Sequence, residues 1–175
     1  PAPPDDAVVF GNAFHAVMEQ YPQPVEAAVS RLVRSGMVPS RMAKELTAMA
    51  SRTLQIPAVR EALASDGCLH EWPFLLTIGP FIVRGKVDLL APAASPVRIV
   101  DFKTGVPLRE GQPGIEEYRW QLAIYSQAVQ SAFGSPALAH LVFTRDGSTV
   151  AGFSPSDILL RFDKMGLDCR NPQKP

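Results

Sequence analysis

The chain has 175 residues with a hydrophobic share of 46%, enough for one sizeable core, and no run of about 18 apolar residues that would span a membrane. The formal net charge is zero, which neither indicates nor excludes a nucleic-acid partner, because local patches matter more than the total. Two cysteines, Cys68 and Cys169, exclude a disulfide framework, a four-cysteine zinc site and a cysteine-ligated iron–sulfur cluster, so we expect a cytoplasmic protein.

Residues 1–65 predict a short tail followed by four helices. Residues 1–6 are rich in proline and begin without methionine, so we expect a tail or linker within a longer protein. Apolar side chains then recur at helical spacing, with Ser40 placed to cap the third helix and Pro57 suited to the first turn of the fourth. The helices are expected over residues 7–21, 24–35, 40–54 and 57–64. Between residues 31 and 60, six basic residues stand against one acidic residue, so this part is locally basic.

The rest of the chain has the pattern of a sheet with one long helix. Strands are expected over residues 70–78, 81–91, 97–102, 138–144 and 149–153, and helices over residues 115–133 and 154–165. The first three strands are expected to form an antiparallel meander, and the long helix to carry the chain to the fourth strand. The predicted fold class is therefore α/β of the α+β kind, with a central mixed β-sheet flanked by helices.

The domain organisation follows from these elements. Residues 7–170 are expected to form a single domain, with a helical part over residues 7–65 and a sheet-containing part over residues 66–170. Residues 171–175 are expected to be a frayed tail.

Charged residues in two predicted strands indicate where chemistry takes place. The segment V-R-I-V-D-F-K-T at residues 97–104 places Asp101 and Lys103 on one face of an apolar strand, where an unpaired charge is costly. In the preceding strand Asp88 shares a face with Arg84 and Lys86. Val87 and Leu89 are expected on the opposite face, unless a bulge at Gly85 shifts the alternation.

Two interpretations of these acidic residues remain open. Carboxylates are preferred ligands of Mg²⁺, so Asp88 and Asp101 on neighbouring strands can hold the ion while Lys103 acts on water or phosphate. Alternatively, Asp88 and Asp101 are strand-end acids paired with nearby arginine or lysine side chains.

Five short motifs, taken in order, resemble a known family. The chain has G-N-A-F-H at residues 11–15, Glu71, G-K-V-D at residues 85–88, I-V-D-F-K-T-G at residues 99–105 and Q-L-A-I-Y at residues 121–125. This series resembles the RecB/AddA-type nuclease domain of the PD-(D/E)XK, or restriction-endonuclease-like, superfamily. Val87 stands where the proline that names the superfamily would be, but this branch usually lacks that proline.

The resemblance implies roles for several residues. His15, Asp88 and Asp101 are expected to bind Mg²⁺, with Mn²⁺ able to replace it and the Phe102 carbonyl as a further ligand. Lys103 is then catalytic. Gln121 and Tyr125 are expected to line the site from one helix face, and Glu71 either supports the ligands or is simply solvated. No iron–sulfur cluster is expected, because the cysteines that some relatives use for it are absent.

The function implied is a metal-dependent DNA exonuclease of a helicase–nuclease, acting on a single strand or a duplex end in double-strand break repair and recombination. The helicase motor would lie elsewhere in a longer chain or in a partner subunit, because no G-x-x-x-x-G-K-[ST] motif is present. The alternatives are a catalytically silent module that binds DNA or a partner subunit, and a restriction-type endonuclease, which needs a sequence-reading element. Candidate DNA contacts are Arg31, Arg34, Arg41, Lys44, Arg84 and Lys86, although the helical ones also fit a solvated helix face.

Overall fold

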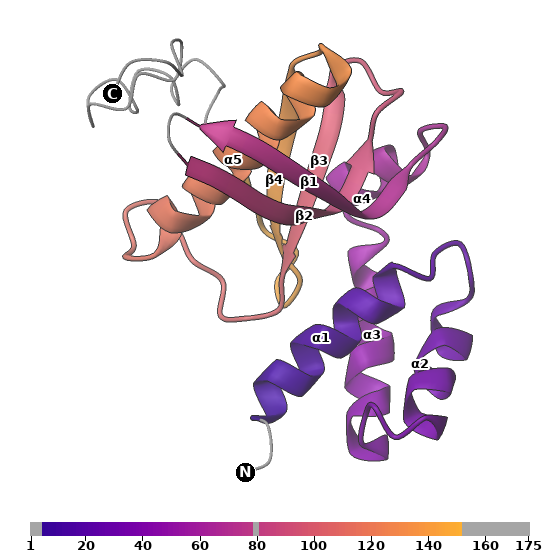
Figure 1. The fold of residues 1–175 in the computed structure, drawn as a ribbon. Helices are drawn as coiled ribbons and strands as arrows, with labels where there is room; N and C mark the ends of the chain where they lie inside the picture. Colours follow the sequence, from indigo (N-terminus) through magenta and orange to yellow (C-terminus); the bar gives the residue numbers. More distant parts are fainter. Residues whose placement is uncertain (1–4, 79–80, 152–175) are drawn as a thin grey trace.

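A computed structural model describes residues 5–78 and 81–151, which form a five-stranded sheet with helices on both faces (Figure 1). The helices are α1 (Asp6–Met18), α2 (Val25–Arg34), α3 (Ala43–Thr53), α4 (Pro57–Leu63) and α5 (Ile115–Phe133), with a short 3-10 helix η1 (Ser40–Met42) before α3. The strands are β1 (Leu69–Ile78), β2 (Phe81–Ala91), β3 (Val97–Lys103), β4 (Ala137–Phe143) and β5 (Thr149–Ala151).

The sheet has the strand order β1-β2-β3-β4-β5. Strands β1, β2 and β3 form an antiparallel meander, β4 runs parallel to β3, and β5 is antiparallel to β4. Parallel neighbours need a crossover connection, and α5 supplies it between β3 and β4. The predicted mixed sheet, its flanking helices and the helical N-terminal region are therefore confirmed.

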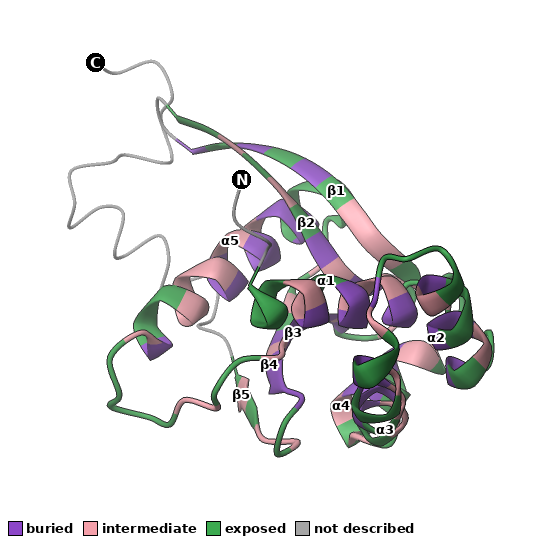
Figure 2. Cartoon of the chain, turned by 90° about the horizontal axis from the view of Figure 1, so that it is seen from below, coloured by how far each residue is buried: buried purple, intermediate pink, exposed green. Residues whose placement is uncertain are grey.

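Two hydrophobic clusters cover opposite faces of the sheet, and Figure 2 shows the buried sides of α1 and α5 turned toward it. The α1 cluster joins helices α1–α4 to sheet residues Leu89, Ala91, Val100, Phe102 and Val142. The α5 cluster joins helix α5 to sheet residues that include Val87, Leu90, Val97, Ile99 and Leu141. Side chains alternate along β3, so Asp101 continues the face of Val97 and Ile99, as the spacing predicted.

Strand β2 departs from the predicted alternation at Asp88. Val87 belongs to the α5 cluster and Leu89 to the α1 cluster, so the prediction that these two share a face was wrong. No bulge lies at Gly85, because Trp72 pairs with Val87 in the same register that pairs Phe74 with Gly85. The side chains of β2 instead change face between Asp88 and Leu89, because both residues lie on the α1 side. This point is opposite Glu71, whose backbone φ is 49°.

Some predicted boundaries need correction. Helix α1 begins at Asp6, where Asp5 accepts a bond from the Ala7 amide at 3.0 Å, so the predicted end of the tail lies one residue too late. Ser40 does not cap α3 but opens η1, and α3 follows from Ala43. The predicted turn at residues 79–80, the end of the fifth strand beyond residue 151, the last helix and the C-terminal tail lie outside the described residues.

We expect Gly85→Ala to destabilise the protein by about 1–3 kcal/mol, measured by urea unfolding, because a core that is already packed resists added volume. A Cβ atom at Gly85 would lie 2.7 Å from Cζ of Phe74, whose ring is 9% exposed and packs edge-on against Tyr125 at 5.5 Å. Gly105→Ala is the matched control, since its Cβ would meet nothing within 4 Å. In a Phe74→Leu background the cost of Gly85→Ala should fall, and an equal cost in both backgrounds would contradict this explanation.

Candidate functional site

The site forms where strands β2 and β3 cease to pair. Leu89 pairs with Val100, so the next residues along the two antiparallel strands are Asp88 and Asp101. Beyond this point the Phe102 amide donates to Oδ2 of Asp88 at 2.7 Å. A carboxylate therefore takes the place of a strand carbonyl, which fixes the Asp88 side chain against β3.

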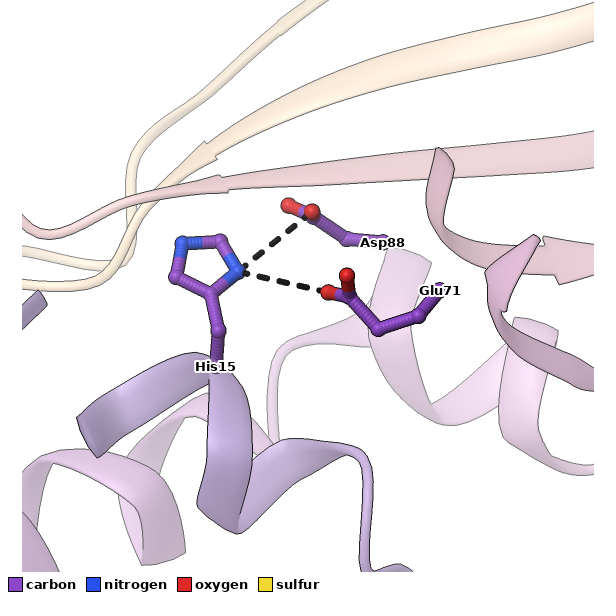
Figure 3. A group of neighbouring side chains, drawn as sticks. All are labelled: His15, Glu71 and Asp88. Atoms are coloured by element: carbon purple, nitrogen blue, oxygen red, sulfur yellow. Dashed lines mark ion pairs between the residues drawn. The ribbon is translucent and has the colours of Figure 1, made fainter. Parts of the chain in front are cut away.

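Helix α1 adds an imidazole, and β1 adds a second carboxylate (Figure 3). The Nδ1 atom of His15 lies 3.3 Å from Oδ1 of Asp88 and 4.0 Å from Oε1 of Glu71. One ligand atom from each of the three residues lies within 4.8 Å of the others. The side chains are only partly buried, with exposed fractions of 31% for His15, 22% for Glu71 and 13% for Asp88, so an ion can reach them from solvent.

Lys103 is held by contacts from two elements. Its Nζ lies 2.7 Å from Oδ2 of Asp101 and donates to Oε1 of Gln121 at 2.9 Å. The amide of Gln121 in turn donates to the hydroxyl of Tyr125 at 2.6 Å. The spacing of four residues therefore does place Gln121 and Tyr125 on one face of α5, beside Lys103.

Tyr118 also contacts Lys103, and the sequence analysis did not identify it. The Nζ atom of Lys103 lies 5.0 Å from the centroid of the Tyr118 ring, which is the geometry of a cation–π contact. Tyr118 precedes Gln121 by three residues, one helical turn earlier on the same face. That spacing was the available signal, but it becomes informative only once α5 is known to lie beside β3.

Asp101 is the most deeply buried acid of the site, with a residue exposure of 1%. Burial raises the pKa of Asp101 to about 6, and the nearby charge of Asp88 adds to this while Lys103 and His15 oppose it. Oδ2 of Asp101 already faces the ammonium group of Lys103 at 2.7 Å, and this contact opposes the rise of the Asp101 pKa.

The pKa of His15 is raised above its usual value of 6.5. Burial alone lowers it, but the hydrogen bond to Asp88 and the charges of Asp88, Asp101 and Glu71 outweigh that effect. Burial also raises the pKa of Tyr125, and Asp101 adds to the rise, so its hydroxyl stays protonated. The site therefore concentrates negative charge that its own cations only partly offset.

Glu71 is not simply solvated. It lies within the cluster, and its Oε2 accepts from Nζ of Lys86 at 2.8 Å. Its φ of 49° places a residue with a Cβ in the left-handed region, which costs about 1–2 kcal/mol. This strain lies directly opposite Asp88, so the backbone irregularity of the sheet and the group of ligand atoms coincide.

The basic residues expected to contact DNA lie on several elements and differ in their partners. Arg31 donates to two glutamine side chains, and Arg41 pairs with Asp6 at 2.7 Å. Arg34 and Lys44 line a groove of about 760 Å³ between α2 and α3, whose lining includes none of the site residues described above. Only Arg84 and Lys86 lie on the strand that carries Asp88.

The residues present fit a divalent cation. An imidazole nitrogen and two carboxylates converge, and Asp101, whose carboxylate is paired with Lys103, lies beside them outside this group of ligand atoms. Such a donor set suits Mg²⁺ or Mn²⁺ better than a soft metal, because oxygen ligands predominate.

The fold was compared with those of solved protein structures. The chain is similar to “Putative exonuclease” from Eubacterium rectale, with a TM-score of 0.62 and 12% identity over 99% of this chain and 67% of that one. Protein VC1899 from Vibrio cholerae matches with a TM-score of 0.39 and 14% identity over 95% of this chain and 48% of that one. SSO0001 matches with a TM-score of 0.39 and 14% identity over 94% and 86%. The first of these structures shares the fold of this chain.

No curated protein matches the sequence. A family model described as the PD-(D/E)XK nuclease superfamily matches residues 1–160, a span that contains every residue of the site. The mixed sheet with its flanking helices is consistent with the restriction-endonuclease-like fold of that superfamily, whose members use divalent metal ions. The chain therefore belongs to the PD-(D/E)XK nuclease superfamily.

Proposed function

We propose that this chain is a Mg²⁺-dependent exonuclease of the RecB/AddA type, which hydrolyses phosphodiester bonds in DNA. The observation that carries the proposal is the grouping of His15, Glu71 and Asp88 within 4.8 Å, beside the paired Asp101 and Lys103. A bound divalent ion would supply an acidified water molecule and would offset charge on the phosphate.

The chain's own residues divide the remaining tasks. His15, Asp88 and Asp101 are the proposed ligands, and the position of Glu71 in the cluster makes it a fourth candidate. The Phe102 carbonyl is a further candidate, because the N–H and C=O of one strand residue face the same neighbour and this N–H already faces Asp88. Mn²⁺ should replace Mg²⁺, since it accepts imidazole more readily.

Lys103 is the proposed catalytic cation. The charge of Asp101, the Gln121 carbonyl and the Tyr118 ring hold its ammonium group, while 21% of the side chain stays exposed. A fixed ammonium group at this position can orient the attacking water or neutralise charge that builds on the phosphate. Gln121 and Tyr125 then act by fixing the orientation of Lys103.

The biological setting is proposed from the motif series. The five motifs over residues 11–125 support a nuclease domain that works with a helicase motor, in the same longer chain or a partner subunit, during double-strand break repair. Within the described residues, the helices are too short or too polar to cross a bilayer. Cys68 is a free thiol, which suits the proposed cytoplasmic location.

We expect the chain to degrade linear DNA with Mg²⁺ or Mn²⁺. Lys103→Gln should lower the rate by about 10²–10⁴-fold, the usual contribution of a positioned acid–base group, and Asp101→Asn should lower it because the variant lacks the charge of a proposed ligand. The measurement is nucleotide release from end-labelled linear DNA, with covalently closed DNA of the same sequence as the second substrate.

Arg52→Gln is the control, because Arg52 is an exposed cation of α3 outside the site. Variants that cleave as fast as the parent would refute the assignment of Asp101 and Lys103. Equal cleavage of closed and linear DNA would indicate an endonuclease, and binding of DNA without cleavage would indicate the silent module.

Metal binding should depend on pH with a definite sign. The folded-state pKa values of His15 and Asp101 are both raised, so their contribution to stability is present at low pH and is lost as the pH rises through those values. A divalent ion competes with these protons, so the rise in Tm caused by MnCl₂ should be small near about pH 5 and grow toward about pH 8. The measurement is the Tm of thermal unfolding with MnCl₂ and with EDTA at each pH. Subtracting the two Tm values removes the contribution of histidines elsewhere in the chain, because they titrate in both conditions. A shift that is equal at all pH values, or undiminished in Asp88→Asn, would contradict metal binding at this site.

A further inference from the structure

The outer face of the β1–β2 hairpin combines exposed aliphatic and basic side chains. Leu75 is 72% exposed and Ile82 is 71% exposed. Leu75 pairs with Arg84 in the antiparallel register, and Ile82 lies two residues before Arg84, so the three side chains share one face. The alternate residues, among them Phe74, pack into the α5 cluster on the opposite face.

Beyond Glu71 and Asp88 of the site, the two charged side chains on this outer face are both basic. The face comprises Pro73, Leu75, Thr77, Ile82, Arg84 and Lys86, which we call the hairpin platform. It carries two cations and no acidic residue. Arg84 is exposed and has no ion pair or hydrogen bond with any residue that the structure describes, whereas Lys86 is paired with Glu71 of the site.

The hairpin platform leads directly into the site. Ile82, Arg84, Lys86 and Asp88 follow one another on the same side of β2, and at roughly 3.4 Å per residue they cover about 20 Å. Asp88 contacts His15 of α1, so this side of β2 is the one that faces the site. Figure 1 shows the β1–β2 ribbon extending away from α1, α2 and α3.

We propose that the hairpin platform binds single-stranded DNA and leads it to the metal site, so that the substrate of the proposed nuclease is an unpaired strand. This inference rests on the proposed function. Arg84 contacts a backbone phosphate, and Leu75 and Ile82 pack against bases or sugars of the same strand.

The aliphatic side chains decide between a single strand and a duplex. A duplex presents mainly phosphates to a flat surface, which would leave Leu75 and Ile82 without an apolar partner. A single strand exposes base faces as well as phosphates, and proteins bind it with a positively charged groove beside side chains, most often aromatic ones, that pack on the bases. Exposed aliphatic side chains can pack against the same base faces. Two neighbouring side chains that are about seven-tenths exposed therefore match the unpaired strand.

The test measures binding in EDTA, where no cleavage occurs, by fluorescence anisotropy of a labelled single-stranded oligonucleotide and of the matching duplex. The parent should bind the single strand more tightly. Leu75→Ser and Ile82→Ser should each weaken single-strand binding by about fivefold to tenfold. Arg84→Gln should reduce the slope of log K against log salt by about 0.7, the value for one phosphate contact on a single strand.

Two substitutions elsewhere serve as matched controls. Arg52→Gln removes an exposed cation from α3, and Met37→Ser removes an apolar side chain that is 62% exposed, so neither should change single-strand binding. Thermal unfolding of each variant shows that the fold is kept. Binding that is absent in the parent, tighter to the duplex, or equally affected in platform and control variants would overturn the inference.

The outcomes separate the platform from the proposed activity. Normal cleavage with unchanged binding in Leu75→Ser, Ile82→Ser and Arg84→Gln would leave the nuclease and refute the platform. If the parent binds a single strand but cleaves nothing, and the platform variants lose that binding, the result would support the platform and refute the nuclease. A change in the sedimentation coefficient of DNA-free Leu75→Ser or Ile82→Ser would assign this face to protein contacts and refute the inference.

Discussion

The site depends on the placement of two carboxylates, Asp88 and Asp101, side by side at the point where two strands cease to pair. Like charges in a poorly hydrated position repel, and the raised pKa of Asp101 reflects both burial and the charge of Asp88. Each neighbour offsets part of this cost. The Phe102 amide bonds to one acid, Lys103 pairs with the other, and His15 lies 3.3 Å from Asp88. The residual negative charge is what a divalent ion would neutralise.

The two hydrophobic clusters bring these compensating groups from opposite sides of the sheet. His15 extends from α1, whose packing against the sheet fills the α1 cluster. Gln121 extends from α5, which carries the chain from β3 to its parallel neighbour and fills the α5 cluster. Lys103 is therefore held from the α5 side, while Asp88 is held from the α1 side. A site at the point where β2 and β3 cease to pair can draw on groups from both faces of the sheet.

The sequence predicts those parts of this arrangement that depend on local periodicity or on a linear motif. The bounds of α5, the facing of Asp101 with Ile99, and the meander all follow from spacing and are confirmed. Contacts between distant segments were not predictable in the same way. The ring of Tyr118 meets Lys103 only because a crossover helix packs on β3.

Charge counts along the helical segment leave out contacts between distant residues for a similar reason. The run from residue 31 to residue 60 is basic, but folding pairs Arg41 with Asp6, thirty-five positions earlier. Arg34 and Lys44 border a groove between α2 and α3. Ser40 illustrates the same limit at a helix end, because its capping potential is overridden by a 3-10 turn that precedes α3. Tertiary packing decides which residues of a locally basic or capped pattern take part in a site.

The strained backbone at Glu71 lies opposite Asp88, and the next residue, Leu89, is fully buried. In a regular strand, Asp88 and Leu89 would point to opposite faces, but here Asp88 contacts His15 of α1 and Leu89 packs in the α1 cluster. Glu71, which lies opposite Asp88 on β1, has a positive φ that costs about 1–2 kcal/mol. Full burial of a leucine contributes about 1.5–3 kcal/mol, and Leu89 is 0% exposed. Burial of Leu89, the residue next to Asp88, is therefore large enough to offset the strain at Glu71.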